Sequence, residues 1–315
     1  MRFAASLALA VGLGIAFPAN CGPGIVSVLP HETDPAIRES DPPHRIFLDS
    51  SVPPRGQLLV FLPGTGAGTS DQDEFGRTAA SLGYHVVYLM YPNDVPAAVC
   101  QDDEDENAFE KFRREIIQGG DLDSRVAVDR ANSIENRLVK LVRWLAVNRS
   151  GAGWEQFLDG NEPAWQKIAL AGHSQGGGHA QLLAKDHAVA RVVVLGSPKD
   201  YSLRHGRPAA WYGGGQTPSV RMFAFVHVQD TQAISHAQQV QNLRASGLDT
   251  IADTDERAPP FDNAHVLTTN HPGRPVNSGL AHLGLVFDFT LPRGPDGQPV
   301  YRPVWIYMLT ASVDD

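Results

Sequence analysis

The sequence contains little cysteine and no cluster of basic residues. Its 315 residues include two cysteines, Cys21 and Cys100, so the chain could close at most one disulfide. The formal net charge is −9, and no run of lysine and arginine interrupts this acidic balance. Nucleic-acid binding needs a basic patch, and binding to an anionic membrane surface needs a basic amphipathic segment. We therefore expect neither kind of partner.

The motifs of several other enzyme classes are also missing. The glycine-rich segments have neither the lysine of a phosphate-binding loop nor the G-x-G-x-x-G spacing of a dinucleotide site. No H-E-x-x-H or His-x-x-x-His pair is present, and the acidic run of residues 102–106 lacks the glycine and spaced glutamate of a calcium loop. The sequence therefore predicts no metal ion and no cofactor.

The first residues have the pattern of a secretion signal. Arg2 precedes an apolar run over residues 3–16, which is too short to span a bilayer, and Pro18 follows it. We expect residues 1–20 to be a signal peptide with a short N-terminal segment, and the mature protein to be secreted or periplasmic, without stable membrane insertion. Residues 21–315 are long enough for one large core and are expected to form a single domain.

Apolar runs typical of strands alternate with segments of helical spacing, which is the pattern of a parallel sheet built from βαβ units. The strand candidates are residues 58–62, 85–91, 168–171, 191–195, 221–228 and 264–269. The clearest helix is predicted between about residues 129 and 147, with Asp129 as its candidate N-cap. The pattern predicts an α/β fold with a doubly wound, mostly parallel sheet and helices on both faces. Residues 92–126 and 200–215 interrupt it and are expected to be loop or lid insertions.

One segment carries a catalytic motif. Residues 168–171 form a strand-like run that leads into Gly172-His173-Ser174-Gln175-Gly176 and then into a helix-like segment. In a nucleophile elbow, the serine lies on a sharp turn between strand and helix, and glycines on either side leave room for that turn. Ser174 is therefore the candidate nucleophile. The backbone amide of Gln175, at the start of the helix, is a candidate donor to developing negative charge.

The sequence Gly172-His173-Ser174-Gln175-Gly176-Gly177 resembles the G-H-S-x-G-G elbow of serine α/β-hydrolases of the esterase and lipase type, and the chain is similar to secreted bacterial members of unassigned substrate. The resemblance covers about residues 57–290. It implies an α/β-hydrolase fold and a nucleophile, an acid and a histidine in that chain order, with the acid after a late strand and the histidine in a loop after the last strand.

Two aspartates are candidates for the acid. Asp230 ends the strand-like segment of residues 223–230, and Asp200 follows the preceding strand. We favour Asp230, because the carboxylate that orients the histidine belongs at the carboxyl end of a strand beside the nucleophile. His227, in step with the apolar residues of the same strand, is interpreted as a core histidine.

Three histidines are candidates for the base. His265 falls within a strand-like alternation, and His271 lies directly at a strand exit before a proline. His282 follows a loop rich in glycine, proline and asparagine and precedes an apolar segment. We favour His282, because this position after a loop is the one that the fold gives its histidine.

The oxyanion hole of such a site needs a second amide from the loop after an early central strand. Residues 62–68 supply a glycine-rich loop of this kind, in which Thr65 is the favoured donor and Gly66 the alternative. Pro63 stands where related esterases often have histidine, so the motif leaves the choice between these two amides open.

Together these residues predict a secreted, cofactor-free serine hydrolase that cleaves a small-molecule or polymer ester through an acyl-enzyme. The ester preference rests on analogy with the fold. The alternatives are a peptidase or thioesterase of the same fold and a binding protein on a hydrolase scaffold without catalytic activity. A metal-dependent enzyme is a further alternative, which the missing metal motifs disfavour.

Overall fold

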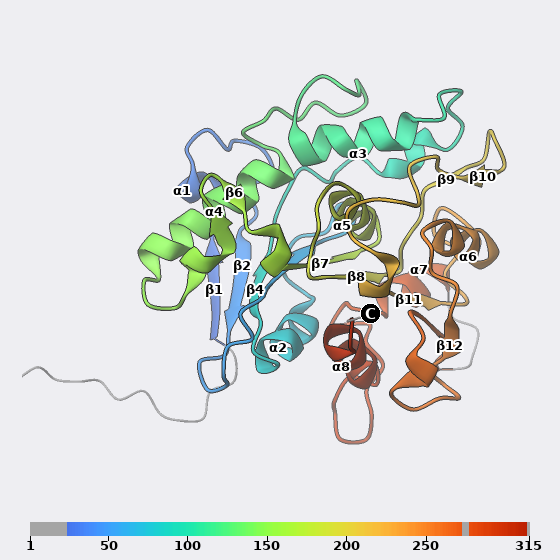
Figure 1. Cartoon of the computed structure of the whole chain (residues 1–315). Helices are drawn as coiled ribbons and strands as arrows, with labels where there is room; N and C mark the ends of the chain where they lie inside the picture. Colours follow the sequence, from blue (N-terminus) through green and yellow to red (C-terminus); the bar gives the residue numbers. More distant parts are fainter. Residues whose placement is uncertain (1–23, 273–276, 314–315) are drawn as a thin grey trace, which may run out of the picture.

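A computed structural model describes residues 24–272 and 277–313, which form a large central sheet covered by helices (Figure 1). The predicted signal peptide of residues 1–20 and Cys21 lie outside the described residues, so the pairing of Cys21 with the buried Cys100 stays untested. The sheet has nine strands in the order β1-β2-β4-β3-β7-β8-β11-β13-β12. These strands are β1 (Gly24–Val28), β2 (His44–Leu48), β3 (Leu58–Leu62), β4 (His85–Tyr88), β7 (Ile168–His173), β8 (Arg191–Leu195), β11 (Met222–His227), β12 (Ile251–Asp253) and β13 (Val266–Thr269).

Most of the sheet is parallel, as the sequence predicts. β2 pairs antiparallel with β1 and with β4, and the other neighbouring strands are parallel. Every residue of β3, β7, β8 and β11 is buried. Strands in the middle of a parallel sheet are covered on both faces, which explains why these segments are mostly apolar in the sequence.

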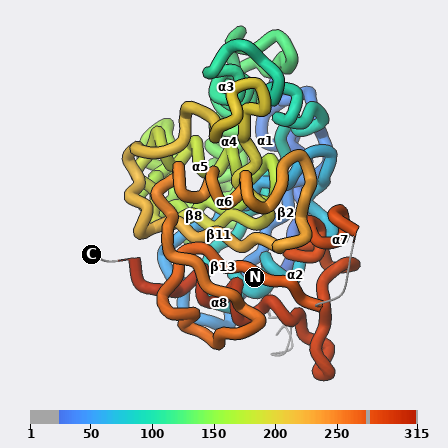
Figure 2. Tube along the Cα trace, turned by 90° about the vertical axis from the view of Figure 1, so that its right-hand side faces the viewer, coloured from blue at the N-terminus to red at the C-terminus, as the bar shows by residue number. Residues whose placement is uncertain are grey.

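Helices cover both faces of the sheet, so the doubly wound prediction is confirmed. One apolar cluster joins α3, α4 and α5 to one face, and a second cluster joins α2 and α8 to the other. Figure 2 shows β8, β11 and β13 between α5 and α6 on one side and α8 on the other. The helices are α1 (Pro30–Thr33), α2 (Asp73–Ser81), α3 (Ala108–Gln118), α4 (Ile134–Asn148), α5 (Gln175–Asp186), α6 (His236–Ala245), α7 (Ser278–Leu283) and α8 (Arg302–Thr310). None of the described helices is both long enough and apolar enough to cross a membrane.

The helix predicted from residue 129 begins later than expected. α4 starts at Ile134, and its N-cap is Ser133, whose hydroxyl accepts a hydrogen bond from the Asn136 amide. The candidate N-cap Asp129 is wrong: its carboxylate instead accepts from the amide of Asn132, in a turn that precedes the helix. Both aspartate and serine cap helices well, so the sequence alone did not separate the two positions.

The two stretches predicted as insertions lie against each other. Residues 92–126 contain α3 and a short 3₁₀ helix (Ala97–Cys100), and residues 200–215 contain a small hairpin of β9 (Tyr201–Ser202) and β10 (Arg207–Pro208). The amides of Leu203 and Arg204 donate to the carbonyl oxygen of Gln101, and Arg204 pairs with Glu104. A further antiparallel pair, β5 (Leu158–Asp159) with β6 (Glu162–Pro163), lies outside the main sheet.

The strand order also determines where chemistry can occur. β3, β7, β8 and β11 are consecutive parallel neighbours, so their carboxyl ends meet at one edge of the sheet. In open α/β sheets, ligands bind outside the carboxyl ends of the strands. The loops that leave these four strands contain Thr65, Ser174, Lys199 and Asp230.

Candidate active site

Ser174 lies on a strained turn between β7 and α5. Its backbone has φ 54° and ψ −121°, a conformation that residues other than glycine rarely adopt. The Ser174 amide donates a 2.9 Å hydrogen bond to the carbonyl oxygen of Leu195, at the end of the neighbouring strand β8. Strain of this kind persists only where the surrounding structure holds it in place, and it lifts the serine side chain clear of the strand.

The glycines of the motif are required by backbone contacts across the turn. A Cβ atom at Gly176 would overlap the carbonyl oxygen of Leu62, and one at Gly172 would overlap the backbone of Gly176. A Cβ at Gly64, in the loop after β3, would lie 3.1 Å from the Ser174 Cβ. The turn is therefore packed directly against the loop that the sequence proposes for the oxyanion hole.

His282 and Asp230 form a buried hydrogen-bonded pair. Nδ1 of His282, on α7, lies 2.7 Å from Oδ2 of Asp230, in the loop after β11. A carboxylate only accepts hydrogen bonds, so Nδ1 carries the proton and Nε2 is the nitrogen left to act on a substrate. Burial alone would raise the pKa of Asp230, but the hydrogen bond and charge of His282, together with Lys199, lower it to about 2.

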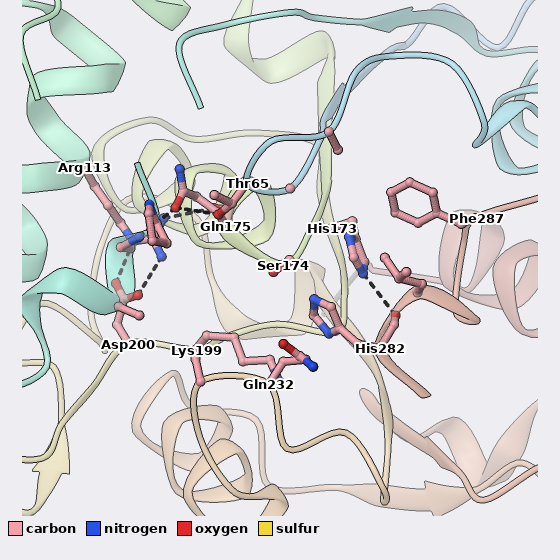
Figure 3. A pocket seen from close by; sticks show the side chains of 17 residues that line it. Thr65, Arg113, His173, Ser174, Gln175, Lys199, Asp200, Gln232, His282 and Phe287 are labelled. Carbon is pink, nitrogen blue, oxygen red and sulfur yellow. Dashed lines mark hydrogen bonds and ion pairs between the residues drawn. The ribbon is translucent and has the colours of Figure 1, made fainter. Parts of the chain in front are cut away.

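The three residues favoured from the sequence come together at one pocket. Ser174 and His282 both line a cavity of about 260 Å³, and Asp230 lies behind His282 with its side chain fully buried. Figure 3 shows the His282 ring beside Ser174. Among the described residues no hydrogen bond joins the Ser174 hydroxyl to this ring, and such contacts often tighten only when substrate binds.

The structure places the rival acid in a different role. Asp200 accepts two 2.6 Å hydrogen bonds from Arg113 and a 2.9 Å bond from Trp211 Nε1. Both members of the Asp200–Arg113 pair are almost completely buried. The Asp200 carboxylate is therefore used to neutralise Arg113, whereas the Asp230 carboxylate contacts a histidine.

The other candidate histidines lie away from Ser174. Nδ1 of His265 donates to the carbonyl oxygen of Met222, and the His271 ring packs edge-on against Tyr301. Neither lines the pocket around Ser174. His227 is buried in β11, where its Nε2 donates to the carbonyl oxygen of His271, which agrees with its interpretation as a core histidine.

Backbone hydrogen bonds distinguish the two oxyanion candidates. The Gly66 amide donates to the carbonyl oxygen of Asn93. Among the hydrogen bonds of the described residues, neither the Thr65 amide nor the Gln175 amide has an acceptor. The side chains of these two residues are joined, because the Thr65 hydroxyl donates to Gln175 Oε1 over 3.0 Å. Both residues line the pocket, so the geometry favours Thr65 over Gly66 as the donor from this loop.

Three further residues contact the site, and the sequence reasoning missed them. Nζ of Lys199 lies 2.8 Å from Asp230 Oδ2. Nε2 of His173 donates to the carbonyl oxygen of His282, and Nη1 of Arg113 donates to the carbonyl oxygen of Gln175. Burial, followed by the neighbouring His282, lowers the pKa of His173 well below its ordinary value. His173 occupies the variable position before the serine, and nothing in the sequence around Lys199 or Arg113 signals these contacts.

The pocket has walls of different chemistry. Phe287 lies on one side of Ser174, and Arg113 with Asp200 lies on the other (Figure 3). Ala67 and Leu283 also line the pocket. The described residues contain no group of three or more histidine, cysteine, aspartate or glutamate side chains placed to hold a metal ion.

The strand order and the turn at Ser174 together assign the fold. Three features define this fold. β2 pairs antiparallel with its neighbours, and β4 lies between β2 and β3 in the strand order. A serine also lies on the strand-to-helix turn of a central parallel strand. The chain has the α/β-hydrolase fold.

Comparisons with known proteins add little to this assignment. No family model matches the chain, and no curated protein matches it. Among solved structures, the chain is similar to one from Klebsiella pneumoniae subsp. pneumoniae MGH 78578, provisionally described as a dienelactone hydrolase. The sequences are 11% identical, the match covers 78% of this chain and 84% of the other, and the TM-score is 0.38. A likeness this weak supports no statement about function.

Proposed function

We propose that this protein is a serine hydrolase that cleaves a carboxylic ester through an acyl-enzyme intermediate. The observation that carries the proposal is the strained Ser174 in one pocket with a histidine whose Nδ1 is hydrogen-bonded to a buried carboxylate. A nucleophile, a base and a group that orients the base are the parts that acyl transfer through a serine requires.

In the proposed reaction, Ser174 Oγ attacks the ester carbonyl carbon while Nε2 of His282 accepts the serine proton. Asp230 keeps the Nδ1 proton in place and stabilises the imidazolium that forms. The proton then passes from Nε2 to the departing alkoxide, so an alcohol leaves and the acyl group stays on Ser174. A water molecule, deprotonated by His282, attacks the acyl carbon in the second half, and the carboxylic acid and the free serine result.

The negative charge that develops on the carbonyl oxygen needs preorganised donors. The amides of Thr65 and Gln175 suit this role, because they flank Ser174 and have no acceptor among the described residues. The side chain of Gln175 also accepts from the Ala97 amide over 2.7 Å, which fixes the start of α5 against residues 95–97. Donors held rigidly in this way stabilise a transition state without reorganising during the reaction.

The proposed substrate is a small-molecule or polymer ester, and the proposed location is secreted or periplasmic. The location rests only on Arg2 and the apolar run of residues 3–16. Expression of the full chain in a bacterial host, followed by fractionation and N-terminal sequencing of the product, tests it. A full-length product that stays in the cytoplasm would contradict the proposed signal.

A fluorophosphonate probe, which labels activated serines, tests the catalytic proposal. The wild-type protein should be labelled and should hydrolyse soluble aryl esters, and Ser174→Ala should lose both properties. Loss of the nucleophile typically lowers the rate by about 10⁶-fold. Ser81→Ala is a matched control, because the Ser81 hydroxyl donates to the carbonyl oxygen of Thr78 within α2 and Ser81 does not line the pocket.

The outcomes of this experiment separate the alternatives. Unchanged labelling or turnover in Ser174→Ala would overturn the proposed mechanism. Labelling of the wild-type protein without ester hydrolysis would point to a peptide or thioester substrate. No labelling of the folded wild-type protein would favour a binding protein on a hydrolase scaffold.

A further inference from the structure

The Asp230 carboxylate carries a second, cationic partner in addition to His282. Nζ of Lys199 lies 2.8 Å from Oδ2, the same oxygen that accepts from His282 Nδ1 at 2.7 Å. The Lys199 side chain is 8% exposed and that of Asp230 is completely buried. The Lys199 ammonium and the His282 ring therefore share one oxygen of Asp230. The proposed reaction assigns no role to this ammonium.

Two other segments and the loop of Asp230 itself hold the carboxylate in position. Lys199 comes from the loop after β8, and His282 comes from α7. The amide of Gln232 donates to the other oxygen, Oδ1, over 2.9 Å. The Lys199 loop is tied to α6, because Asn242 Nδ2 donates to the carbonyl oxygen of Pro198. With both oxygens occupied, the carboxylate has little freedom to rotate away from the histidine.

The charge of Lys199 opposes the effect that Asp230 has on His282. A carboxylate alone would favour the protonated imidazolium, whereas a cation on the same oxygen disfavours it. Burial lowers the pKa of Lys199, although the Asp230 charge counteracts this. Because Asp230 is ionised above about pH 2 and accepts from Lys199, the two form an ion pair at neutral pH.

The other titratable groups around the pair contribute little charge. The ring of His173 lies with its centroid 4.4 Å from that of His282, and burial keeps its pKa well below the ordinary value, so it is neutral. Burial, followed by the charge of Lys199, also lowers the pKa of His236. On the opposite wall, Arg113 and Asp200 neutralise each other. Lys199 is therefore the main positive charge acting on the pair.

We propose that Lys199 is a positioning residue that fixes the ionised Asp230 toward His282 and extends the activity of the enzyme to lower pH. The inference rests on the proposed serine hydrolase function. The ammonium lies on the carboxylate oxygen that faces His282 and offsets part of its negative charge. Removal of this cation should therefore move the acid limb of the activity profile to higher pH.

The pH dependence of kcat/KM between pH 5.5 and 9 tests this inference. We compare the wild-type protein with Lys199→Met, Lys199→Gln and Lys199→Arg, using a soluble aryl ester and counting active sites with the fluorophosphonate probe. Lys199→Met and Lys199→Gln should move the acid limb of the profile to higher pH by about one unit. This is the lower end of the shift that a neighbouring charge causes in a titration. Lys199→Arg keeps the charge and should leave the limb in place.

Lys185→Met is the matched control. Lys185 is also a partly buried lysine with one hydrogen bond, to the carbonyl oxygen of Gly213, and it lies outside the pocket around Ser174. Its profile should match that of the wild-type protein. Lys199→Gln keeps a hydrogen-bond donor without the charge, so it separates the two contributions and gives a second variant if Lys199→Met does not fold.

An activity loss in Lys199→Met and Lys199→Gln that is equal at every pH, with the acid limb unmoved, would overturn the inference and leave Lys199 a structural role. An unmoved limb in Lys199→Gln alone would also overturn it, because the hydrogen bond and not the charge would then be responsible. Failure of the proposed function would be recognised separately, since the wild-type protein would then show neither labelling nor ester hydrolysis.

Discussion

Substitution of Asp200 by asparagine should destabilise the protein while leaving the chemical step largely intact. The Asp200 carboxylate accepts two hydrogen bonds from Arg113, and both side chains are 1% exposed. Asparagine keeps the shape but removes the negative charge. The guanidinium would then stay buried with only neutral acceptors, among them the carbonyl oxygen of Gln175.

The expected cost follows from the burial of the pair. Removing one partner of a buried ion pair typically costs about 3–5 kcal/mol, because the other charge is left without compensation. This is a large share of the roughly 5–15 kcal/mol that stabilises a typical domain. Asp230→Asn should differ in its effect on catalysis, with kcat lowered by about 10⁴-fold because the wrong histidine tautomer is favoured.

Urea unfolding at pH 7.5 and kcat on an aryl ester, measured on the same samples, test this separation. Asp186→Asn is the matched control, since Asp186 also accepts two hydrogen bonds from an arginine of α3, Arg114. Those side chains are about a quarter exposed, so we expect a cost of at most about 1 kcal/mol. A fully stable Asp200→Asn variant whose kcat falls a thousandfold would refute the reasoning and give Asp200 a part in the reaction.

Two further predictions concern pH and substrate size. The free energy of unfolding should fall as the pH drops below about 6.5, because burial lowers the pKa of His44 to about 3 and those of His173 and His179 well below their ordinary value. The unfolded chain then binds more protons than the folded one, and three such groups make the free energy of unfolding fall by about 4 kcal/mol per pH unit. Urea titrations from pH 7 to 5.5 that show no loss of unfolding free energy would contradict this prediction. The pocket of about 260 Å³ should favour short acyl chains, so kcat/KM over a series of aryl esters should decline with chain length. A steep rise of kcat/KM with chain length, together with activation by a triglyceride emulsion, would instead indicate a lipase.

Some features of this protein were determined locally and could be derived from the sequence. The continuous apolar runs of β3, β7 and β8 identify buried parallel strands, because only strands covered on both faces need no polar residues. The G-x-S-x-G turn is equally local, since its glycines are required by contacts within one turn and with the adjacent strand end. The start of α4 was predicted wrongly at Asp129, because aspartate and serine both cap helices well and Ser133 takes this position in the structure.

The partners of Ser174 depend on the tertiary structure. Asp200 and Asp230 both follow parallel strands, and only the packing of α3 against α5 brings Arg113 to the first and leaves the second facing α7. His282 lies 52 residues from Asp230 along the chain, so no local pattern records their contact. Lys199 is the clearest case. Its sequence neighbourhood resembles a surface loop, and its buried charge is tolerated only because the fold places the Asp230 carboxylate beside it.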